Sequence, residues 1–247
     1  MNITATLEKL NAMRLQGFEQ AYRNILDSAV QEKFTPDELI AHLVDAEFDD
    51  KYNRKLKRLI KTANFKQQVS IEQVDYHLPR TLDKNIVLRL QSCDWINKAR
   101  DLLITGATGT GKSFLACAFG MQACINELKT LYYTANNLLD KMTYAKADGT
   151  YFKMLDSISK AKLLIIDDFG LRKIDNKQCN MLLDIIDERH GKSSTIITSQ
   201  LPVKNWYDCF SEPTIAEAIL DRISNSSYRI HFEGTKSVRK FLNNSEE

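Results

Sequence analysis

A complete phosphate-loop motif constrains the fold of this 247-residue chain more than any other feature. Residues 106–113 read GATGTGKS and match G-x-x-x-x-G-K-[ST] at every defined position. The apolar run at 102–104 precedes the motif, and the apolar run at 114–116 follows it. A strand that enters the loop and a helix that leaves it are the context this motif requires. The sequence therefore predicts an α/β domain whose first loop binds a nucleotide.

The residue types of this loop suit the phosphates of ATP. Glycines let the backbone curl so that several N–H groups face one anionic point, and the N-terminus of the next helix adds a positive partial charge there. Lys112 is expected to reach the β- and γ-phosphates, and the Ser113 hydroxyl is expected to bind Mg²⁺. The expected nucleotide-binding residues are Gly106, Ala107, Thr108, Gly109, Thr110, Gly111, Lys112, Ser113 and Phe114.

A second part of the same site is expected 55 residues beyond Lys112, where an apolar run ends in two carboxylates. Residues 163–168 read LLIIDD, which is typical of a buried strand. Asp167 is expected to hold the Mg²⁺ shell together with Ser113. Asp168 is expected to point another way, because side chains alternate along a strand, and to orient and deprotonate the attacking water. The phosphate loop disfavours the alternative that these acids merely cap the next loop.

The rest of the chain predicts how these motifs are arranged. Strand-like runs at 101–105, 130–134, 162–167 and 194–199 alternate with helical stretches at 113–127, 135–160 (with a turn near Gly149) and 175–190. This alternation predicts a parallel sheet flanked by helices. Residues 67–80 lose strong periodicity and contain Pro79. We therefore expect an all-helical N-terminal domain over 1–66, a linker over 67–80, and the α/β domain over 81–247.

One N-terminal helix has a polarised charge pattern that allows two interpretations. Thr35, Pro36 and Glu38 predict a capped start, and the helix that follows can run to about residue 62. Residues 31–50 hold seven acids and one base, whereas 51–66 hold seven bases and no acid. The pattern fits either a helix that matches its own dipole or a strip that binds DNA phosphates. The candidate DNA-binding residues of this basic strip are Lys51, Arg54, Lys55, Lys57, Arg58 and Lys61.

Composition excludes several classes of protein. Hydrophobic residues make up 43% and charged residues 27%, with a net charge of +2, as in ordinary globular proteins. No apolar run approaches the roughly 18 residues that cross a bilayer, and the N-terminus lacks the order of a signal peptide. The five cysteines form no CxxC pair, which predicts buried, reduced thiols. We expect a cytoplasmic protein without a membrane partner.

Together these segments resemble the AAA+ ATPases of the IstB type, which are the helper proteins of a bacterial insertion-sequence family and are related to DnaC-type helicase loaders. The resemblance covers about residues 78–240 and, more loosely, the N-terminal helices. Besides the phosphate loop, it rests on LPR with TL (78–82), LLIIDDFG (163–170), STIITSQLP (194–202) with Trp206, AILDRI (218–223) and TKSVRK (235–240). The ordered set is far more specific than the phosphate loop alone.

The resemblance implies roles for residues outside the two motifs. Gln200 matches sensor 1, where relatives usually carry Asn, and would read the γ-phosphate. Arg222 matches the arginine finger that reaches a neighbouring subunit's nucleotide, and Arg239 matches the sensor 2 arginine of the same subunit. A surface salt bridge is the alternative for either arginine. Asp168 stands where many AAA+ proteins have Glu, which implies slow hydrolysis stimulated by DNA or a partner.

The resemblance also implies a function. A finger supplied in trans implies a homo-oligomer, a ring or spiral, that ATP and Mg²⁺ hold together on double-stranded DNA. The assembly would select a target and recruit a partner transposase. Two alternatives stay open at this point, a replicative helicase loader of the DnaC type and a nucleotide-gated DNA-binding scaffold with little hydrolysis.

Overall fold

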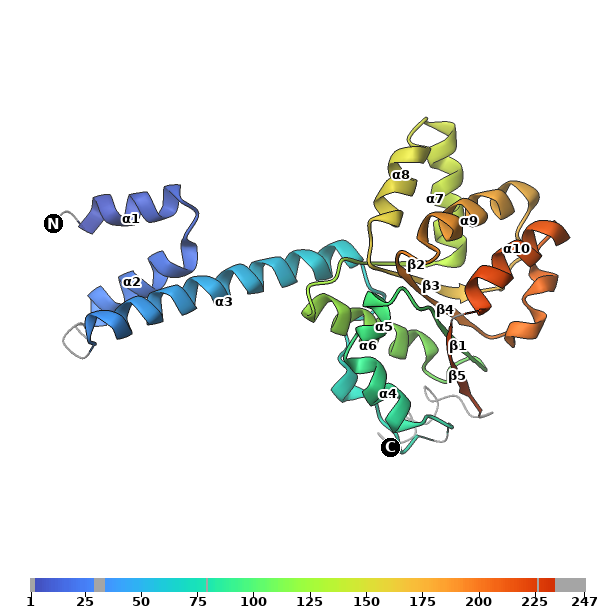
Figure 1. Cartoon of the computed structure of the whole chain (residues 1–247), viewed down its shortest axis with the longest axis horizontal. Coiled ribbons are helices and arrows are strands. Elements are labelled where there is room, and N and C mark those ends of the chain that lie inside the picture. The colour runs from blue at the N-terminus through green and yellow to red at the C-terminus, as the bar shows by residue number, and fades with distance from the viewer. Residues whose placement is uncertain (1–2, 29–33, 79, 226, 234–247) are drawn as a thin grey trace, which may run out of the picture. The chain divides into compact units, whose positions relative to one another are not determined.

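The chain folds into two compact units, Met1–Arg58 and Leu59–Glu247. The computed structural model describes residues 3–28, 34–78, 80–225 and 227–233 (Figure 1). The division between the units falls inside helix α3 (Pro36–Ala63), whereas the sequence places the linker at 67–80. Residues 67–80 belong to the second unit because Ile71 and Val74 are buried in its core.

The N-terminal unit is helical, as the sequence predicts. It contains α1 (Ile3–Ala12), α2 (Gln16–Ser28) and the first part of α3. Ala21 and Ile25 of α2 pack against Leu43 of α3. The predicted capping box is present, because the Thr35 N–H donates to Glu38 Oε2 at 2.8 Å and the Glu38 N–H donates to Thr35 Oγ1 at 3.3 Å.

A five-stranded parallel sheet forms the centre of the second unit (Figure 1). Its strands are β1 (Leu102–Gly106), β2 (Thr130–Thr134), β3 (Leu163–Phe169), β4 (Ser194–Ser199) and β5 (Tyr228–Phe232). Their order in the sheet is β2-β3-β4-β1-β5, and every pair is parallel. All five carboxyl ends therefore lie at one edge, which is where open α/β sheets bind ligands. The α/β fold and its first four strands confirm the prediction, and β5 is an additional strand.

Helices cover both faces of this sheet. They are α4 (Lys84–Gln91), α5 (Asp94–Asn97), α6 (Lys112–Ile125), α7 (Ala135–Ala147), α8 (Tyr151–Ser159), α9 (Asn176–Arg189) and α10 (Pro213–Ser224), with short 3-10 turns at Ile71–Gln73, Val203–Asn205 and Tyr207–Cys209. Leu103 and Ile166 face a core with α7, α9 and α10. Leu102 and Ile165 face a second core with α4, α5 and α6. Side chains that alternate along the strands thus separate the two cores.

The buried side chain of Arg189 connects several elements at the edge of the first core by hydrogen bonds. The Arg189 side chain is 1% exposed and donates at 2.7 Å to the carbonyls of both Ile158 and Ala161. It also donates to the Ser194 carbonyl and to Thr195 Oγ1. Burial lowers the pKa of Arg189 to about 10, against the raising effect of Asp101. These bonds join the end of α8 to α9 and to the start of β4.

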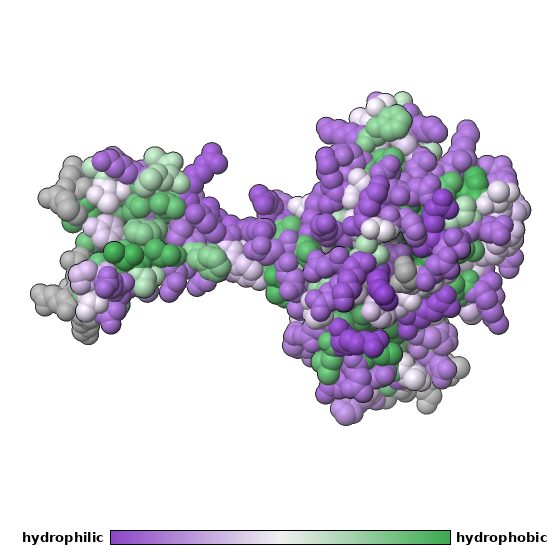
Figure 2. Space-filling model, in the orientation of Figure 1, coloured by the Kyte–Doolittle hydropathy of each residue, from purple (hydrophilic) through white to green (hydrophobic). Residues whose placement is uncertain are grey.

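The polarity of the surface and the burial of the cysteines match what the composition predicts. Hydrophilic residues cover most of the visible face of the α/β unit (Figure 2). Within the part of the chain that the structure describes, no helix is both long and apolar enough to span a bilayer. All five cysteines are free and buried, which confirms the prediction of buried thiols.

Candidate nucleotide-binding site

The phosphate loop joins the carboxyl end of β1 to the N-terminus of α6, as its motif requires. Two of its glycines occupy positions that a side chain would disturb. Gly106 has φ +149°, and an added Cβ would lie 2.7 Å from the Phe232 Cβ on β5. Gly111 has φ +93° and precedes the first residue of α6. The backbone that precedes α6 therefore curls as an anion-binding loop must.

Lys112 lies folded against this loop. Its side chain is 5% exposed, and its Nζ donates to the carbonyls of Gly106 and Ala107 at 2.7 Å each. Burial lowers the pKa of Lys112, while the charges of Asp168 and Asp167 raise it. The ammonium is therefore held at the centre of the loop, next to the two carboxylates of β3.

Three hydroxyl groups fix the carboxylate of Asp167, which is completely buried. Ser113 Oγ donates to Asp167 Oδ1 at 2.9 Å, and Tyr132 Oη donates to Asp167 Oδ2 at 2.6 Å. The Thr198 hydroxyl on β4 also donates to Asp167 Oδ1. The structure thus brings together the two residues that the sequence assigns to Mg²⁺. Sequence reasoning missed Tyr132 and Thr198, which come from the strands on either side of β3.

Asp168 does not follow the expected alternation of the strand. Its φ is +59°, in the left-handed region, and the register between β3 and β4 shifts between Ile166 and Phe169. Its N–H donates to Thr198 Oγ1 at 3.1 Å. The regular alternation is interrupted here, and the two acids differ in exposure, because Asp167 is fully buried whereas the Asp168 side chain is 28% exposed. Such strain in a non-glycine residue is typical of functional sites.

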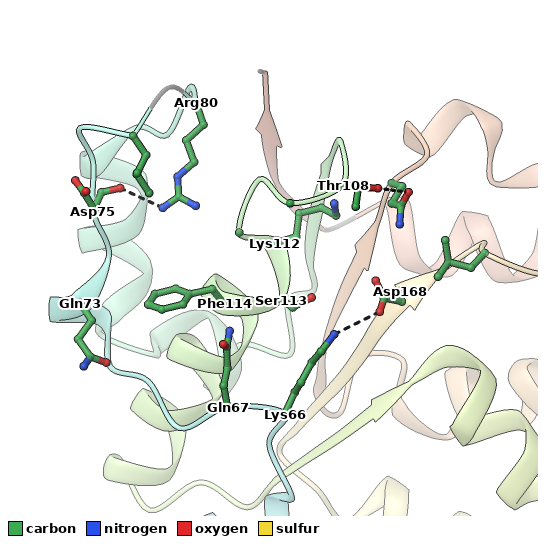
Figure 3. A pocket seen from close by; sticks show the side chains of 15 residues that line it. Lys66, Gln67, Gln73, Asp75, Arg80, Thr108, Lys112, Ser113, Phe114 and Asp168 are labelled. Carbon is green, nitrogen blue, oxygen red and sulfur yellow. Dashed lines mark hydrogen bonds and ion pairs between the residues drawn. The ribbon is translucent and has the colours of Figure 1, made fainter. Parts of the chain in front are cut away.

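A lysine that the sequence did not single out for this site contacts both acids. Lys66 Nζ lies 3.8 Å from Asp167 Oδ2 and 3.7 Å from Asp168 Oδ2. Figure 3 shows the side chain reaching across the cavity toward Asp168. In the sequence, Lys66 is the last base of the run that follows residue 50, so nothing in that run marks it as different. The turn at Asn64 (φ +55°), which ends α3, separates it from the others.

Two polar side chains join the loop to its surroundings. Thr108 Oγ1 donates to Gln200 Oε1 at 2.7 Å, so the residue matched to sensor 1 lies beside the phosphate loop. Arg80 Nη1 donates to the Thr110 carbonyl at 2.6 Å, and its guanidinium stands 5.0 Å from the centroid of the Phe232 ring. Burial lowers the pKa of Arg80. Arg80, in the LPR segment, is a further site residue that sequence reasoning did not assign.

One cavity of about 500 Å³ is lined by residues described above, namely Lys66, Arg80, Thr108, Lys112, Ser113, Asp168 and Gln200. It runs from the phosphate loop to the segment that precedes α4 (Figure 3). The phosphate side carries Lys112, Ser113, Asp168 and Gln200, and the opposite side carries Gln67, Gln73, Asp75, Leu78 and Phe114. Its size lies within the range of small-molecule sites. One end is polar and charged and the other is partly apolar, which suits the phosphates and the base of a nucleotide.

The donor set at the carboxylates fits Mg²⁺ bound together with phosphates. The Ser113 hydroxyl and the Asp167 carboxylate supply oxygen atoms, which this cation prefers, and the Asp168 carboxylate follows Asp167 on β3. Across the described residues, no group of three or more His, Cys, Asp or Glu side chains forms a protein-only metal site. A site that relies on one or two carboxylates and on substrate phosphates is the usual arrangement for Mg²⁺.

Arg222 is not among the residues that line this cavity. Arg222 Nε lies 2.5 Å from Asp187 Oδ1, and Arg222 Nη1 donates to the Ala218 carbonyl at 2.8 Å. Arg239 lies outside the described residues. In the basic strip, Lys51 pairs with Glu47, and Arg54 pairs with Glu47 and Asp50. These ion pairs within α3 show that two of the six bases contact acids of the same helix.

Comparison with known proteins gives a consistent result. Residues 8–245 match the model of the family described as "IstB-like ATP binding protein". An insertion sequence ATP-binding protein of Sinorhizobium fredii is 37% identical over 235 residues, which cover 95% of this chain and 96% of the relative. The ATP-binding protein of insertion sequence IS1162 from Pseudomonas fluorescens is 37% identical over 198 residues, 80% of this chain and 86% of the relative.

Solved structures show the same fold at lower sequence identity. The DnaC helicase loader aligns with a TM-score of 0.54 and 19% identity, over 64% of this chain and 95% of that one. DnaA from Aquifex aeolicus, solved with AMPPCP, aligns with a TM-score of 0.58 and 16% identity, over 74% of this chain and 56% of that one. At these identities the similarity concerns the AAA+ fold alone.

Proposed function

The chain belongs to the family of IstB-like ATP-binding proteins, and we propose that it hydrolyses ATP and assembles on duplex DNA as a helper of transposition. One observation carries the proposal of hydrolysis. Lys112, Ser113, Asp167 and Asp168 meet at the carboxyl ends of β1 and β3. The context of an insertion sequence supports the transposition role, because the relatives from Sinorhizobium fredii and Pseudomonas fluorescens carry that description.

Each residue of the cavity has a part in this reaction. Lys112 and the N–H groups of the loop bind the phosphates. Ser113 and Asp167 supply oxygen ligands, and bound Mg²⁺ adds positive charge against the phosphate oxygens. Asp168 orients the attacking water and accepts its proton. Gln200, held beside the loop by Thr108, reads the γ-phosphate.

The arginine finger makes the proposed site a shared one. Arg222 lies on α10 with its guanidinium held by Asp187, outside the cavity of its own chain. In an oligomer it would stabilise charge on the nucleotide of a neighbouring subunit, and Arg239 would act on the nucleotide of its own subunit. ATP then joins subunits into a ring or spiral. A partner transposase would recognise this assembly.

The basic strip supplies the proposed contact with DNA phosphates. The Lys51 and Arg54 charges are partly neutralised by acids on the same helix. Besides these two bases, the strip contains Lys55, Lys57, Arg58 and Lys61. Phosphate contacts do not depend on base sequence and weaken with salt. The helicase-loader alternative has no specific observation in its favour, because the similarity to DnaC concerns the fold alone.

The Asp168→Asn variant tests hydrolysis. It should bind ATP with unchanged affinity but release phosphate about 10²-fold more slowly, the usual scale of a lost general base. Asp156→Asn, which changes a surface acid paired with Lys160, is the matched control and should hydrolyse ATP normally. Hydrolysis by Asp168→Asn at the wild-type rate would remove the assigned role. An equally slow wild type would favour the scaffold that barely hydrolyses ATP.

Mixing two inactive variants tests the shared site. The Lys112→Ala variant retains the arginine finger but loses ATP binding. The Arg222→Ala variant retains ATP binding but loses the arginine finger. Arg222→Ala alone should bind ATP yet fail to hydrolyse it. One complete site forms where Arg222 of a Lys112→Ala subunit reaches the ATP bound by a neighbouring Arg222→Ala subunit. Phosphate release should therefore return over a range of mixing ratios with DNA present. No recovery at any ratio, with normal assembly of Arg222→Ala alone, would leave Arg222 a structural residue.

A further inference from the structure

Lys66 has a fixed backbone and a side chain that reaches the reacting end of the cavity. Ala63, the last residue of α3, is 1% exposed. Phe65 packs against α6 so closely that a Cβ added at Gly120 would lie 2.5 Å from the Phe65 ring. The main chain on the N-terminal side of Lys66 is therefore anchored in the core. Its side chain extends from there into the cavity that Lys112 and Ser113 also line (Figure 3).

The Lys66 ammonium contacts Asp167, which would hold the divalent cation, and Asp168, the next residue of β3. Its distances to the Oδ2 atoms of Asp167 and Asp168 are 3.8 Å and 3.7 Å, so it is shared almost evenly. Ser113 and Thr198 donate to Asp167 Oδ1, and Tyr132 donates to Oδ2, the oxygen that Lys66 also contacts. Asp168 is the less enclosed acid, with a side chain that is 28% exposed. Lys66 and Asp168 are thus the two partly exposed members of this group, whereas Asp167 is buried.

Two cations cannot share these oxygens without cost. An ammonium and a divalent cation at the same carboxylates repel each other, and the repulsion is stronger where water is partly excluded. Lys66 is 44% exposed, so its ammonium can leave the pair and regain water. Its own pairing with the acids is correspondingly weak, on the scale of exposed ion pairs. The contact is therefore strong enough to compete with a divalent cation and too weak to exclude it.

We propose that Lys66 is a further functional residue of the nucleotide site, whose ammonium competes with the divalent cation for Asp167 and Asp168. The inference rests on the proposed function, since it assumes that ATP and Mg²⁺ bind in this cavity. Through this competition, Lys66 raises the Mg²⁺ concentration that nucleotide binding requires. Because Lys66 is three residues beyond the end of α3, cation binding also changes the contacts of the segment that follows this helix.

The test is a magnesium titration of nucleotide binding by the full chain. Binding of a fluorescent ATP analogue is measured against Mg²⁺ concentration for the wild type, Lys66→Gln and Lys66→Arg. Lys160→Gln is the matched control, because it removes another exposed lysine–carboxylate pair away from the cavity. Lys66→Gln should lower the Mg²⁺ concentration for half-maximal binding by about fivefold, which corresponds to about 1 kcal/mol. Lys66→Arg and Lys160→Gln should stay within about twofold of the wild type.

A second measurement separates this proposal from the proposed function. Mn²⁺ binding without nucleotide, followed by electron paramagnetic resonance, reports on the carboxylate pair directly. Lys66→Gln should bind Mn²⁺ more tightly than the wild type by a similar factor. An unchanged or weaker affinity for both cations in Lys66→Gln would overturn the competition. Failure of the wild type to bind the ATP analogue would instead refute the nucleotide site, while the Mn²⁺ comparison would still decide the role of Lys66.

Discussion

The hydroxyl of Tyr132 offers a measurable test of how the buried carboxylate of Asp167 is held. Tyr132 is 6% exposed, Asp167 is fully buried, and their bond is 2.6 Å long. A hydrogen bond to a charged group contributes about 1.5–3 kcal/mol. Tyr132→Phe keeps the ring and removes only the donor, so it should lower the free energy of unfolding by about 2 kcal/mol. For a chain of this size that corresponds to a fall in Tm of roughly 4–8 °C.

Urea unfolding followed by tryptophan fluorescence measures this change. Both tryptophans, Trp95 and Trp206, are buried in the α/β unit and report on its unfolding. Tyr133→Phe is the matched control, because the next residue of β2 turns its ring toward Lys141 instead, 5.2 Å from the lysine Nζ. The control should change the free energy of unfolding by less than about 0.5 kcal/mol. Equal effects of the two substitutions would refute the view that Tyr132 holds Asp167.

Three other substitutions test separate parts of the account. Lys112→Ala should abolish ATP binding, measured with a fluorescent analogue, because it removes the ammonium that the loop holds between its carbonyls; normal affinity would remove the phosphate-loop assignment. Arg189→Met should lower the free energy of unfolding by about 3 kcal/mol or more, since it leaves buried carbonyls without donors; a change below 1 kcal/mol in urea unfolding would contradict this. Neutralising four bases of the strip together should weaken DNA binding and flatten the slope of log K against log salt by about 0.9 for each lost contact; an unchanged slope would make the strip an assembly surface. The four bases are Lys55, Lys57, Arg58 and Lys61.

The parts of the fold that follow from local sequence were predictable. The phosphate loop, the strand that ends in two acids and the capped helix at Pro36 each carry their own signal within a few residues. The strand β5 also carries a signal, because apolar and polar residues alternate over its five positions, but sequence reasoning did not use it. The stretch at 67–80 reads as a linker because it lacks strong periodicity and contains Pro79, yet Ile71 and Val74 reach the core.

The parts of the site that depend on tertiary contacts were not predictable. Tyr132 and Thr198 become partners of Asp167 only through the strand order β2-β3-β4. The left-handed backbone of Asp168 has only a weak signal in its residue type, since Asp adopts this region more often than most non-glycine residues but still rarely. Lys66 reads as part of a basic run on a helix, and only the end of α3 at Ala63 separates it from that run. The basic run at 51–66 therefore contains both bases that lie on α3 and Lys66, which lines the nucleotide cavity.

Assembly on DNA as a function of nucleotide tests the central claim most directly. The mass of complexes that the full chain forms on a short DNA duplex is measured by analytical ultracentrifugation with ATP, with ADP and without nucleotide. The account predicts large, multi-subunit complexes with ATP, much smaller ones in the other two conditions, and none of the large ones for Lys112→Ala. Complexes of the same mass in all three conditions, or undiminished assembly by Lys112→Ala, would contradict the claim that ATP in this cavity controls assembly on duplex DNA.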